Sequence, residues 1–508
     1  MSNEQSSSSM RGTGFHVAGG LALLALAAHL ATNHRFGFHH DELYFLACGQ
    51  HFDLGYVDHP PLVPWLARLS YELFGDSLRG LRLWSALAHA ATILLVARIA
   101  RELGGRAFAQ GIAALAVFMA PVFMRTGNIL AIPSFEALYW AVATLLVIRI
   151  LKGGGPKWWL AVGLVAGIGL LNKHTMLFWG AGLTAGLILT PHRQMLKSPW
   201  IYAGGAVAGL VFLPNVVWQM QHGWDTVQFI RQLNAETMSE ISRVEFAAGQ
   251  LLYQNPFAAP LWLAGLIFAF TPAGKPWRLF GWMYLTLFVF LLVVKSKIYY
   301  LSPVYPMLFA LGGVAWEHWF AEGRKRAAQP LLAAAVAAGG LALAPVSLPL
   351  LSIDATDRYV KAATMGIIES PYELTGDLHG EFGWQEIAAG VGEAYQALPE
   401  EDKNQLILFG SNYGIAGALD LWGSNYGLPP AHSNVLSYHR WGLSEPCCGV
   451  VLAVTTNPKG FSSLFNDITE IASIHIPEQN PWARTVHVLL CKSPAKDLRQ
   501  LWPEIFEF

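Results

Sequence analysis

A cluster of four ionisable residues follows directly on the first apolar run of the chain. The stretch GFHHDELYFLACGQ, residues 37–50, contains His39, His40, Asp41 and Glu42 in succession. Charged groups beside a membrane-spanning segment are costly and usually face water, a partner or a ligand. A carboxylate in that place can accept the proton of an attacking hydroxyl group. We therefore take Asp41 and Glu42 as candidate catalytic residues; the alternative is a polar cap at a helix end.

Cations that could bind a phosphate group occur near the ends of three later apolar segments. Arg125 precedes TGNILAIPSF, Lys173 lies in the short turn LLNKHTML, and Lys295 and Lys297 lie in VVKSKIYYLSPVYP. Arginine can bind a phosphate through two parallel hydrogen bonds, and lysine acts as a point charge. Group transfer from a lipid-linked phosphate requires three things: cations that stabilise the leaving phosphate, a base that accepts the acceptor's proton, and a membrane that holds the lipid tail. For any one of these cations, the alternative is a side chain that extends to the interface without a function.

The residues around Asp41 also include metal-ligand types. His39, His40, Asp58 and His59 could complete a divalent metal site with Asp41. Nitrogen and oxygen ligands would suit zinc or manganese. The spacing does not give a closed ligand set, so a divalent metal ion stays an open cofactor.

The composition indicates a membrane protein. Of 508 residues, 54% are hydrophobic and 13% are charged, whereas soluble proteins contain about 25% charged residues. The net charge of -1 offers no case for nucleic acid binding. The four cysteines, Cys48, Cys447, Cys448 and Cys491, have the spacing of neither a zinc site nor a disulfide framework.

Apolar runs long enough to cross a bilayer recur up to about residue 350, since a span needs about 20 apolar residues. We predict eleven transmembrane helices, near 15–33, 79–100, 107–124, 133–151, 158–172, 175–190, 200–218, 256–272, 277–294, 300–319 and 328–350. The two around Asn172 are short. The first run could instead be a signal peptide, but the many spans that follow favour a helix that stays in the membrane.

Basic residues cluster in every second loop between these segments. The pairs are Arg101 and Arg106, Lys152 and Lys157, Arg193 and Lys197, Lys275 and Arg278, and the run Arg324-Lys325-Arg326. The positive-inside rule makes these loops cytoplasmic. The N-terminus is then cytoplasmic and the C-terminus extracytoplasmic in a cell (inner) membrane, and the loops with Asp41, Arg125, Lys173 and Lys295 share the outer face.

The first outer loop, residues 34–78, contains a predicted amphipathic helix. One helical face would carry Leu62, Trp65, Leu66, Leu69 and Leu73, and Pro60-Pro61 suits the first turn. Such a helix would lie along the membrane interface, although a surface packing helix has the same pattern.

The composition changes after Leu351, where polar residues return. The strand-like runs QLILFG, CGVVLAVTT and RTVHVLLCK alternate with helical stretches, which predicts a small extracytoplasmic α/β domain over 351–508. Its segment 409–442 is rich in Asn, Tyr, Trp and Gly and could bind a glycan acceptor, or could simply pack. The predicted fold is thus a polytopic α-helical membrane protein, residues 15–350, after a disordered cytoplasmic tail, residues 1–14, and before this domain.

The motifs resemble those of the GT-C membrane glycosyltransferases, in the branch of the protein O-mannosyltransferases and the lipid A aminoarabinose and galacturonic acid transferases. HHDELYFL is similar to the acidic motif after their first transmembrane helix, GYVDHPPLVPWLARL to their interfacial helix region, and KSKIYYLSPVYPMLFALGG to a further element. The resemblance covers residues 15–350. It implies a GT-C-like fold and a sugar donor on polyprenyl phosphate. It also implies an inverting displacement, with Asp41 as the catalytic carboxylate and Glu42 beside it.

The donor phosphate is then expected at the cations of the outer face. The residues assigned to it are Arg125, Lys173, Lys295, Lys297 and Tyr300. The chain departs from the family's pattern at Ile132-Pro133-Ser134, where many relatives carry an acidic residue. Glu136 is the nearest carboxylate, and we group it with His39, His40, Asp58 and His59 as an acceptor or metal site.

The sequence therefore predicts an integral membrane glycosyltransferase that transfers a sugar to a cell-envelope acceptor, among membrane lipids. The acceptor could be a lipid, a glycan or a protein. Two alternatives lack this chemistry: a lipid or solute transporter or flippase, and a non-catalytic envelope assembly protein. The chain shows no paired halves of the kind common in transporters.

Overall fold

The computed structural model describes residues 2–236, 241–321, 326–368, 372–444 and 449–507. Arg324, Lys325, Cys447 and Cys448 lie outside this described part. The chain divides into two compact units. The helical unit comprises Met1–Thr32 and Arg82–Leu348, and the mixed unit comprises Asn33–Leu81 and Pro349–Phe508.

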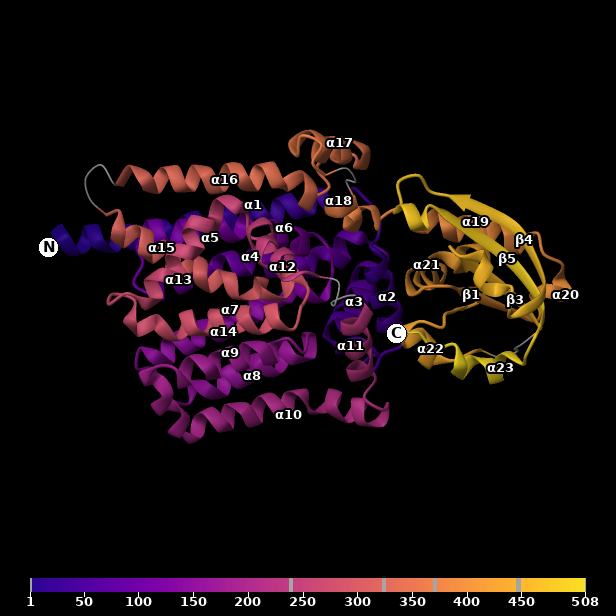
Figure 1. Cartoon of the computed structure of the whole chain (residues 1–508), viewed down its shortest axis with the longest axis horizontal. Helices are drawn as coiled ribbons and strands as arrows, with labels where there is room; N and C mark the ends of the chain where they lie inside the picture. The colour runs from indigo at the N-terminus through magenta and orange to yellow at the C-terminus, as the bar shows by residue number, and fades with distance from the viewer. Residues whose placement is uncertain (1, 237–240, 322–325, 369–371, 445–448, 508) are drawn as a thin grey trace. The chain divides into compact units, whose positions relative to one another are not determined.

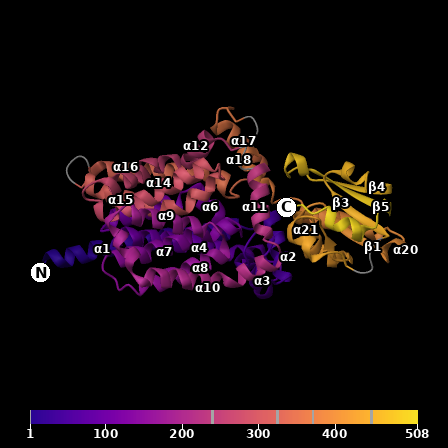
Figure 2. The same ribbon diagram turned by 60° about the horizontal axis from the view of Figure 1, so that its bottom comes forward.

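Long apolar helices build the helical unit and lie side by side in Figures 1 and 2. Within the described residues, seven are long and apolar enough to cross a membrane: α1 (Ser2–Thr32, over Gly14–Thr32), α4 (Leu78–Glu102), α7 (Glu136–Leu151, with the preceding turn), α10 (Pro199–Gln221), α14 (Arg278–Val293, with the preceding turn), α15 (Tyr305–Trp319, with η6, Ile298–Val304) and α16 (Ala328–Ser347). Two bent pairs bring the number to nine: α5 (Ala107–Phe118) with α6 (Pro121–Asn128), and α12 (Arg243–Tyr253) with α13 (Ala259–Phe270). The chain is a multi-pass membrane protein.

The eleven predicted segments fall on described helices, but 107–124 covers α5 and the start of α6 across a 60° bend, and α12, which pairs with α13, was not predicted. The two that fall short of a full span are α8 (Trp158–Asn172) and α9 (Met176–Ile188), the pair around Asn172. Residues 2–14, predicted as a disordered tail, continue the helix of α1. Nucleation is the unfavourable step of helix formation, and residues added to an existing helix do not repeat it. The helix of the first span can therefore extend into residues 2–14. The remaining helix of this unit is α11 (Asp225–Glu236).

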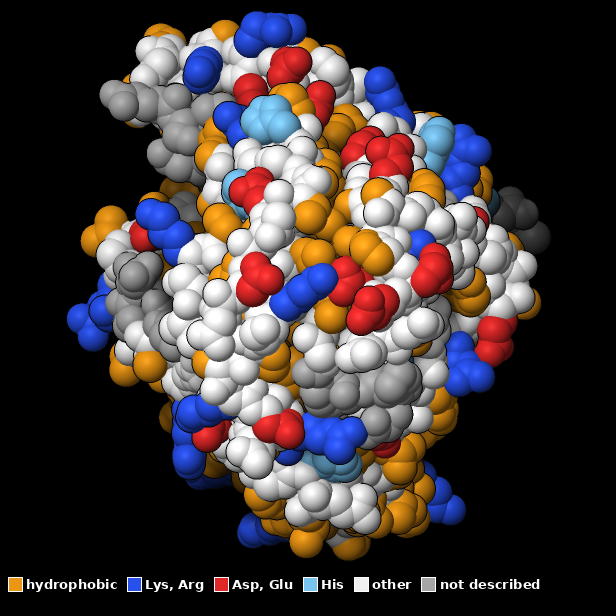
Figure 3. All heavy atoms as spheres, turned by 90° about the vertical axis from the view of Figure 1, so that its right-hand side faces the viewer, with side chains coloured by type: hydrophobic (Ala, Val, Ile, Leu, Met, Phe, Trp, Pro, Cys, Tyr) orange, Lys and Arg blue, Asp and Glu red, His pale blue; other side chains and the backbone are white. Residues whose placement is uncertain are grey.

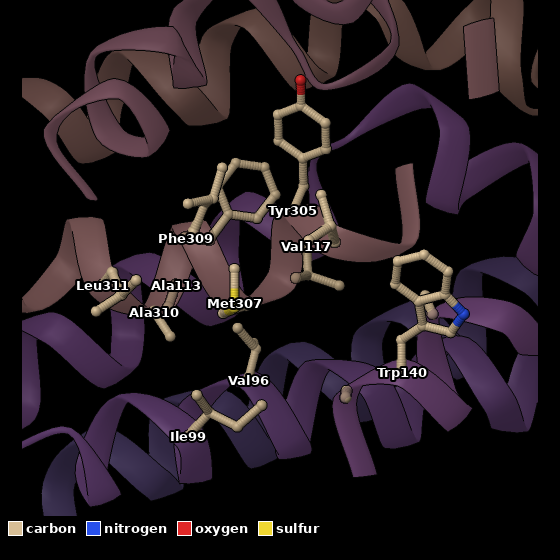
Figure 4. Close-up of a cluster of buried hydrophobic side chains, with 14 of the residues drawn as sticks. Val96, Ile99, Ala113, Val117, Trp140, Tyr305, Met307, Phe309, Ala310 and Leu311 are labelled. Carbon is tan, nitrogen blue, oxygen red and sulfur yellow. The ribbon is translucent and has the colours of Figure 1, made fainter. Parts of the chain in front are cut away.

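Apolar and small side chains from α4, α5, α7 and α15 form the core of the helical unit, as Figure 4 shows. Val96, Val117 and Met307 are almost fully buried there. Elsewhere glycines let helices touch: a Cβ at Gly163 would lie 2.0 Å from the carbonyl oxygen of Gly204. Small residues at such crossings are what helix packing in membranes favours.

Two of the basic loops of the helical unit lie near the end of α15. Lys152 forms an ion pair with Glu102 at 2.6 Å, and the Glu317 carboxylate accepts a hydrogen bond from the backbone N–H of Arg106 at 2.6 Å. These contacts join the loop after α4, the loop after α7 and the end of α15. Two of the five basic loops, those that contain Arg106 and Lys152, therefore lie close together.

A five-stranded mixed sheet forms the centre of the mixed unit. Its strands are β1 (Leu406–Gly410), β2 (Ala431–His432), β3 (Val450–Thr455), β4 (Phe465–His475) and β5 (Thr485–Pro494), in the order β2-β1-β3-β5-β4. β1 pairs in parallel with β2 and β3, and β5 pairs antiparallel with β3 and β4. The three strand-like runs become β1, β3 and β5, which confirms the predicted C-terminal α/β fold.

Helices cover both faces of this sheet. α19 (Trp384–Gln396) and α21 (Tyr413–Trp422) pack against each other and against the strands (Figure 1). The opposite face packs Ile407, Val451 and Leu489 against residues of α23 (Leu498–Leu501). The short helices α17 (Ile353–Ala363), α18 (Tyr372–His379), α20 (Glu400–Lys403) and α22 (Leu436–Trp441) complete the C-terminal segment.

The loop after α1 groups with this C-terminal segment rather than with the transmembrane helices to which the sequence analysis joined it. It forms α2 (His40–Gln50) and α3 (Leu62–Phe74). α2 packs tightly on α21, since a Cβ at Gly417 would lie 2.9 Å from backbone and side-chain atoms of Leu43. Burial of the apolar residues of α2 against α21 therefore determines the grouping.

α3 is the amphipathic helix that the apolar spacing predicts. Its buried residues are Val63, Pro64, Ala67 and Ser70. The predicted apolar stripe is partly buried at its start and exposed at its end, where Leu73 is 58% exposed. The stripe is thus directed away from the interior of the mixed unit.

Candidate active site

The acidic motif forms the N-terminus of α2. The ring nitrogen Nδ1 of His39 accepts a hydrogen bond from the backbone N–H of Asp41 at 3.3 Å, and Glu42 Oε2 accepts one from the backbone N–H of His39 at 2.8 Å. This reciprocal pair is a capping box, which satisfies backbone donors at a helix start. Glu42 is fully buried and acts as a cap here. Asp41 is the carboxylate of this motif whose side chain extends to partners beyond the helix.

Asp41 accepts a hydrogen bond from the hydroxyl group of Tyr413 at 3.0 Å. His40 Nε2 lies 3.5 Å and His39 Nδ1 lies 3.8 Å from its carboxylate oxygens. Burial by itself would raise the pKa of Asp41, but the two histidines and the Tyr413 hydroxyl outweigh it, and the net shift is downward. Burial and the neighbouring His39 lower the pKa of His40 to about 4. At neutral pH, Asp41 is therefore an ionised carboxylate beside a neutral imidazole.

Tyr413 reaches Asp41 because two glycines bring α21 close to α2. A Cβ at Gly414 would lie 2.9 Å from the Cβ of His40. Asn412 caps α21 by accepting a hydrogen bond from the backbone N–H of Ile415 at 2.9 Å, which sets Tyr413 on the first turn. The sequence analysis did not identify Tyr413 as a site residue. The Asn cap before an apolar run signals the helix start, but no local signal connects it to Asp41.

Asp58 and His59 lie in the same unit, and Asp58 is bound to Tyr44. The Tyr44 hydroxyl group donates to Asp58 Oδ1 at 2.9 Å and lies 2.8 Å from the Ser437 hydroxyl of α22. Burial raises the pKa of Asp58; His59 and Tyr44 oppose the shift, and the charge of Asp41 adds to it. The two carboxylates are thus close enough to interact, and their pKa values move in opposite directions. Opposed shifts of this kind separate a group that stays ionised from one that can carry a proton.

His39, His40 and Asp41 could together hold a metal ion. Their ligand atoms all lie within 4.8 Å of one another. Asp377 of α18 adds a carboxylate oxygen at 3.3 Å from His39 Nε2. In this arrangement both ring nitrogens of His39 already face protein partners, the Asp41 backbone N–H and Asp377.

The helical unit holds Glu136 and Lys173 together. Lys173 Nζ lies 2.8 Å from Glu136 Oε2, and the Thr175 hydroxyl donates to the other oxygen of the carboxylate. Nζ also lies 4.3 Å from the centre of the Tyr300 ring and 4.9 Å from that of Tyr299. The carboxylate is 3% exposed and the lysine side chain 14% exposed. Of the residues predicted to bind the donor phosphate, Lys173 and Tyr300 are therefore neighbours, and Glu136 neutralises the lysine.

The other predicted cations belong to the same unit. Arg125 lies in α6, half-buried. Lys295 and Lys297 lie between α14 and η6, where Lys295 adopts a left-handed backbone with φ of 53° and Lys297 precedes the first residue of η6. Asp41 and its neighbours belong to the mixed unit, so the predicted acid motif and the predicted cations come from different units.

Known proteins resemble this chain at three levels. Residues 58–218 match the family model described as dolichyl-phosphate-mannose-protein mannosyltransferase. The lipid A galacturonosyltransferase RgtD of Rhizobium johnstonii is 30% identical over 233 residues, which are 44% of this chain and 48% of that protein. The chain thus matches about half the length of this curated relative.

Two solved structures share the fold over nearly the whole chain. ArnT from Cupriavidus metallidurans bound to undecaprenyl phosphate has a TM-score of 0.59 at 16% identity and covers 92% of this chain and 97% of its own. Its apo state has a TM-score of 0.57 at 18% identity, covering 92% and 96%. These findings agree with the resemblance that the motifs indicate: residues 58–218 match the model of the dolichyl-phosphate-mannose-protein mannosyltransferases, and the chain has an ArnT-like fold.

Proposed function

We propose that this protein is a glycosyltransferase that moves a sugar from a polyprenyl-phosphate donor to a cell-envelope acceptor. The observation that carries the proposal is the ionised Asp41 carboxylate, held by Tyr413 at the start of α2 in a chain of this family. ArnT binds undecaprenyl phosphate, which supports a polyprenyl-phosphate donor. The name of RgtD supports lipid A as the acceptor and galacturonic acid as the sugar.

The reaction is a displacement at the anomeric carbon of the donor sugar. The acceptor hydroxyl oxygen forms the new bond to that carbon, and the bond from the carbon to the phosphate oxygen breaks. The phosphate oxygen leaves with the electron pair, on the opposite side, so the configuration inverts. Asp41 accepts the hydroxyl proton. With its lowered pKa, Asp41 is a weak base that mainly orients the hydroxyl group and takes the proton late.

The leaving polyprenyl phosphate carries negative charge that the enzyme has to stabilise. We assign this role to Arg125, Lys173, Lys295, Lys297 and Tyr300, since phosphates are bound by arginine forks and lysine point charges. Lys173 would share its ammonium group between Glu136 and the phosphate. Preorganised cations at a developing charge typically account for several kcal/mol of catalysis.

We further propose that the reaction takes place on the outer face of the membrane, as the distribution of basic loops indicates. The N-terminus would be cytoplasmic and the mixed unit extracytoplasmic. The polyprenyl tail would then lie in the bilayer and the acceptor would approach from the envelope side.

The test uses the full chain purified in detergent, undecaprenyl-phosphate galacturonic acid and lipid A, with product detection by mass spectrometry. Wild type should transfer the sugar, and Asp41→Asn should lower the rate at least about 100-fold, the size typical for loss of a general base. The control is Glu386→Gln, which replaces an exposed carboxylate on α19 with a carboxamide and should keep the wild-type rate. Retained transfer by a folded Asp41→Asn protein would move catalysis elsewhere. An absence of transfer with any polyprenyl-phosphate sugar would favour the transport alternative.

A further inference from the structure

A pocket lies in the mixed unit at the C-terminal end of α2, the opposite end from Asp41. Its volume is about 500 Å³, and the end of α2, the last part of α21 and the loops around β2 and α22 line it. Ligand pockets typically have volumes of about 300–1,000 Å³. The lining comes largely from segment 409–442, which the sequence analysis noted for its Asn, Tyr, Trp and Gly content.

An aromatic pair forms part of the pocket wall. The imidazole of His51 stacks on the indole of Trp441 with ring centres 3.9 Å apart and planes 8° apart, and Tyr438 meets Trp441 edge to face at 4.7 Å. Leu428 and Pro429 add apolar surface. Flat rings next to aliphatic surface suit the C–H face of a sugar ring.

Polar groups stand beside this apolar surface. Asp420 accepts hydrogen bonds from the Tyr438 hydroxyl at 2.7 Å and from the Ala431 backbone N–H at 2.9 Å, so its carboxylate is held in one orientation. Gln50 and Ser424 lie exposed at the pocket. Their side chains make no hydrogen bond within the described residues and remain available to a ligand.

The charge of the lining excludes some ligand classes. Among the described lining residues there is no lysine or arginine, while Asp420 supplies a carboxylate. His432 uses both ring nitrogens within the protein, at 3.0 Å from the Gly442 carbonyl oxygen and 2.9 Å from the Ser444 hydroxyl, and burial lowers its pKa. A phosphate would meet a carboxylate without a cation, whereas a neutral polyhydroxylated ligand finds amide, hydroxyl and carboxylate partners.

The pocket lies one helix length from Asp41. α2 rises about 1.5 Å per residue, so residues 41 and 51 are about 15 Å apart along it. A sugar that reacts at Asp41 cannot also fill the pocket, but later sugars of the same chain can. We propose that this pocket is a saccharide subsite, which binds sugars of a glycan acceptor distal to the reacting hydroxyl; this inference rests on the proposed function.

The first test measures binding directly with the full chain in detergent. The probe is the core oligosaccharide released from lipopolysaccharide by mild acid and then dephosphorylated, so that its hexose and heptose units are neutral. Its binding is measured by isothermal titration calorimetry. Combined Gln50→Ala and Ser424→Ala substitutions should raise its Kd about tenfold, since both substitutions remove a side chain that can form a hydrogen bond with the ligand. Gln385→Ala, an exposed glutamine of α19 outside the pocket, should leave Kd unchanged. Equal Kd values for wild type and the double variant would overturn the proposal.

Trp441→Ala tests the aromatic wall, with Trp482→Ala as the matched control, because Trp482 is 71% exposed outside the pocket. Trp441→Ala should weaken oligosaccharide binding and Trp482→Ala should not. Trp441→Phe keeps a ring and should recover part of the affinity. If Trp441→Ala does not fold, the Gln50 and Ser424 variant still decides the question.

Transfer kinetics separate this subsite from the reaction itself. For the double variant, KM should rise about tenfold for an acceptor with its full core oligosaccharide, relative to KM for an acceptor trimmed to lipid A. An equal KM change for both acceptors would contradict a distal subsite. Asp41→Asn should bind the oligosaccharide with the wild-type Kd without transferring sugar. If no transfer is found in any variant, the proposed function fails, and the binding measurement still decides whether the pocket binds a saccharide.

Discussion

Asp41 and Asp58 are two carboxylates with different surroundings. Asp41 is held by Tyr413 and flanked by two histidines, which lowers its pKa, whereas burial raises that of Asp58. Asp41 is therefore suited to stay ionised and orient an acceptor. Asp58 is suited to hold the position of Tyr44 and could carry a proton in acid.

Tyr413→Phe removes the hydrogen bond that favours the ionised form of Asp41. The pKa of Asp41 should rise, so the acidic limb of the pH–rate profile should move to higher pH. Because protonated Asp41 cannot accept a proton, activity is lost as the pH falls through this pKa. At neutral pH kcat should fall about tenfold, the size of one hydrogen bond to a charged group. Tyr395→Phe on α19 is the control; an unshifted acidic limb in Tyr413→Phe would contradict the role of this hydrogen bond.

Arg125→Ala should weaken use of the donor more than use of the acceptor. Loss of a charge-assisted hydrogen bond to the phosphate should raise the donor KM about tenfold or more and leave the acceptor KM near its original value. The measurement is initial-rate kinetics with each substrate varied in turn. Arg193→Ala, in a basic loop outside the predicted phosphate-binding set, should change neither. Equal changes in the KM of donor and acceptor would contradict the proposed role of Arg125 in phosphate binding.

A chelator should leave transfer unchanged. His39 Nδ1 accepts a hydrogen bond from the Asp41 backbone N–H and His39 Nε2 lies 3.3 Å from an Asp377 oxygen, so protein atoms already face both ring nitrogens of His39. The experiment compares rates before and after EDTA treatment and dialysis. A loss that one added divalent ion restores would show that the cluster binds a metal.

At the scale of elements, the contact of α2 with α21 brings the site together. Gly417→Ala would place a Cβ 2.9 Å from Leu43, where the nearest atoms include backbone that cannot move freely. Overpacking of this kind costs about 1–3 kcal/mol, although alanine by itself favours a helix over glycine by about 1 kcal/mol. The melting temperature in detergent should therefore fall, together with activity.

Gly376→Ala in α18 is the matched control for that substitution. A Cβ there would lie 3.5 Å from Asn480 Oδ1, an ordinary contact. This variant should be as stable as wild type or slightly more stable. A Gly417→Ala protein with an unchanged melting temperature would mean that α2 and α21 do not pack closely in solution.

At the scale of the whole molecule, the proposed orientation in the membrane can be tested by cysteine labelling. In a variant without the native cysteines, Gln385→Cys should react with a membrane-impermeant maleimide on intact cells, and Lys157→Cys only after permeabilisation. Both positions are exposed. Labelling of Lys157→Cys alone on intact cells would reverse the proposed topology.

The face of the molecule drawn in Figure 3 is not dominated by one sign of charge. On the face in Figure 3, acidic and basic side chains are interspersed, and the net charge is -1. Long-range steering needs a surface of one sign. We therefore expect acceptor recognition to depend on local sites such as the pocket, with only a weak effect of salt on transfer.

The sequence by itself determined the features that local patterns encode. A helix that crosses a membrane needs a run of apolar residues, so the apolar helices could be found one at a time, seven to nine of them candidate spans within the described residues. The strands β1, β3 and β5 likewise stand out as short apolar runs, and the motif around Asp41 points to the family. The alternation of basic loops can also be read from the sequence, because each loop lies between two apolar segments.

Only the tertiary structure decided which distant residues meet. Tyr413 is 372 residues from Asp41, and the contact depends on two glycines of α21 that no helical period connects to α2. For the same reason the sequence could not group residues 33–81 with the C-terminal segment or reveal the pocket at the end of α2. Periodicity reports which face of an element is buried, whereas the partner of that face is chosen by packing across the folded chain.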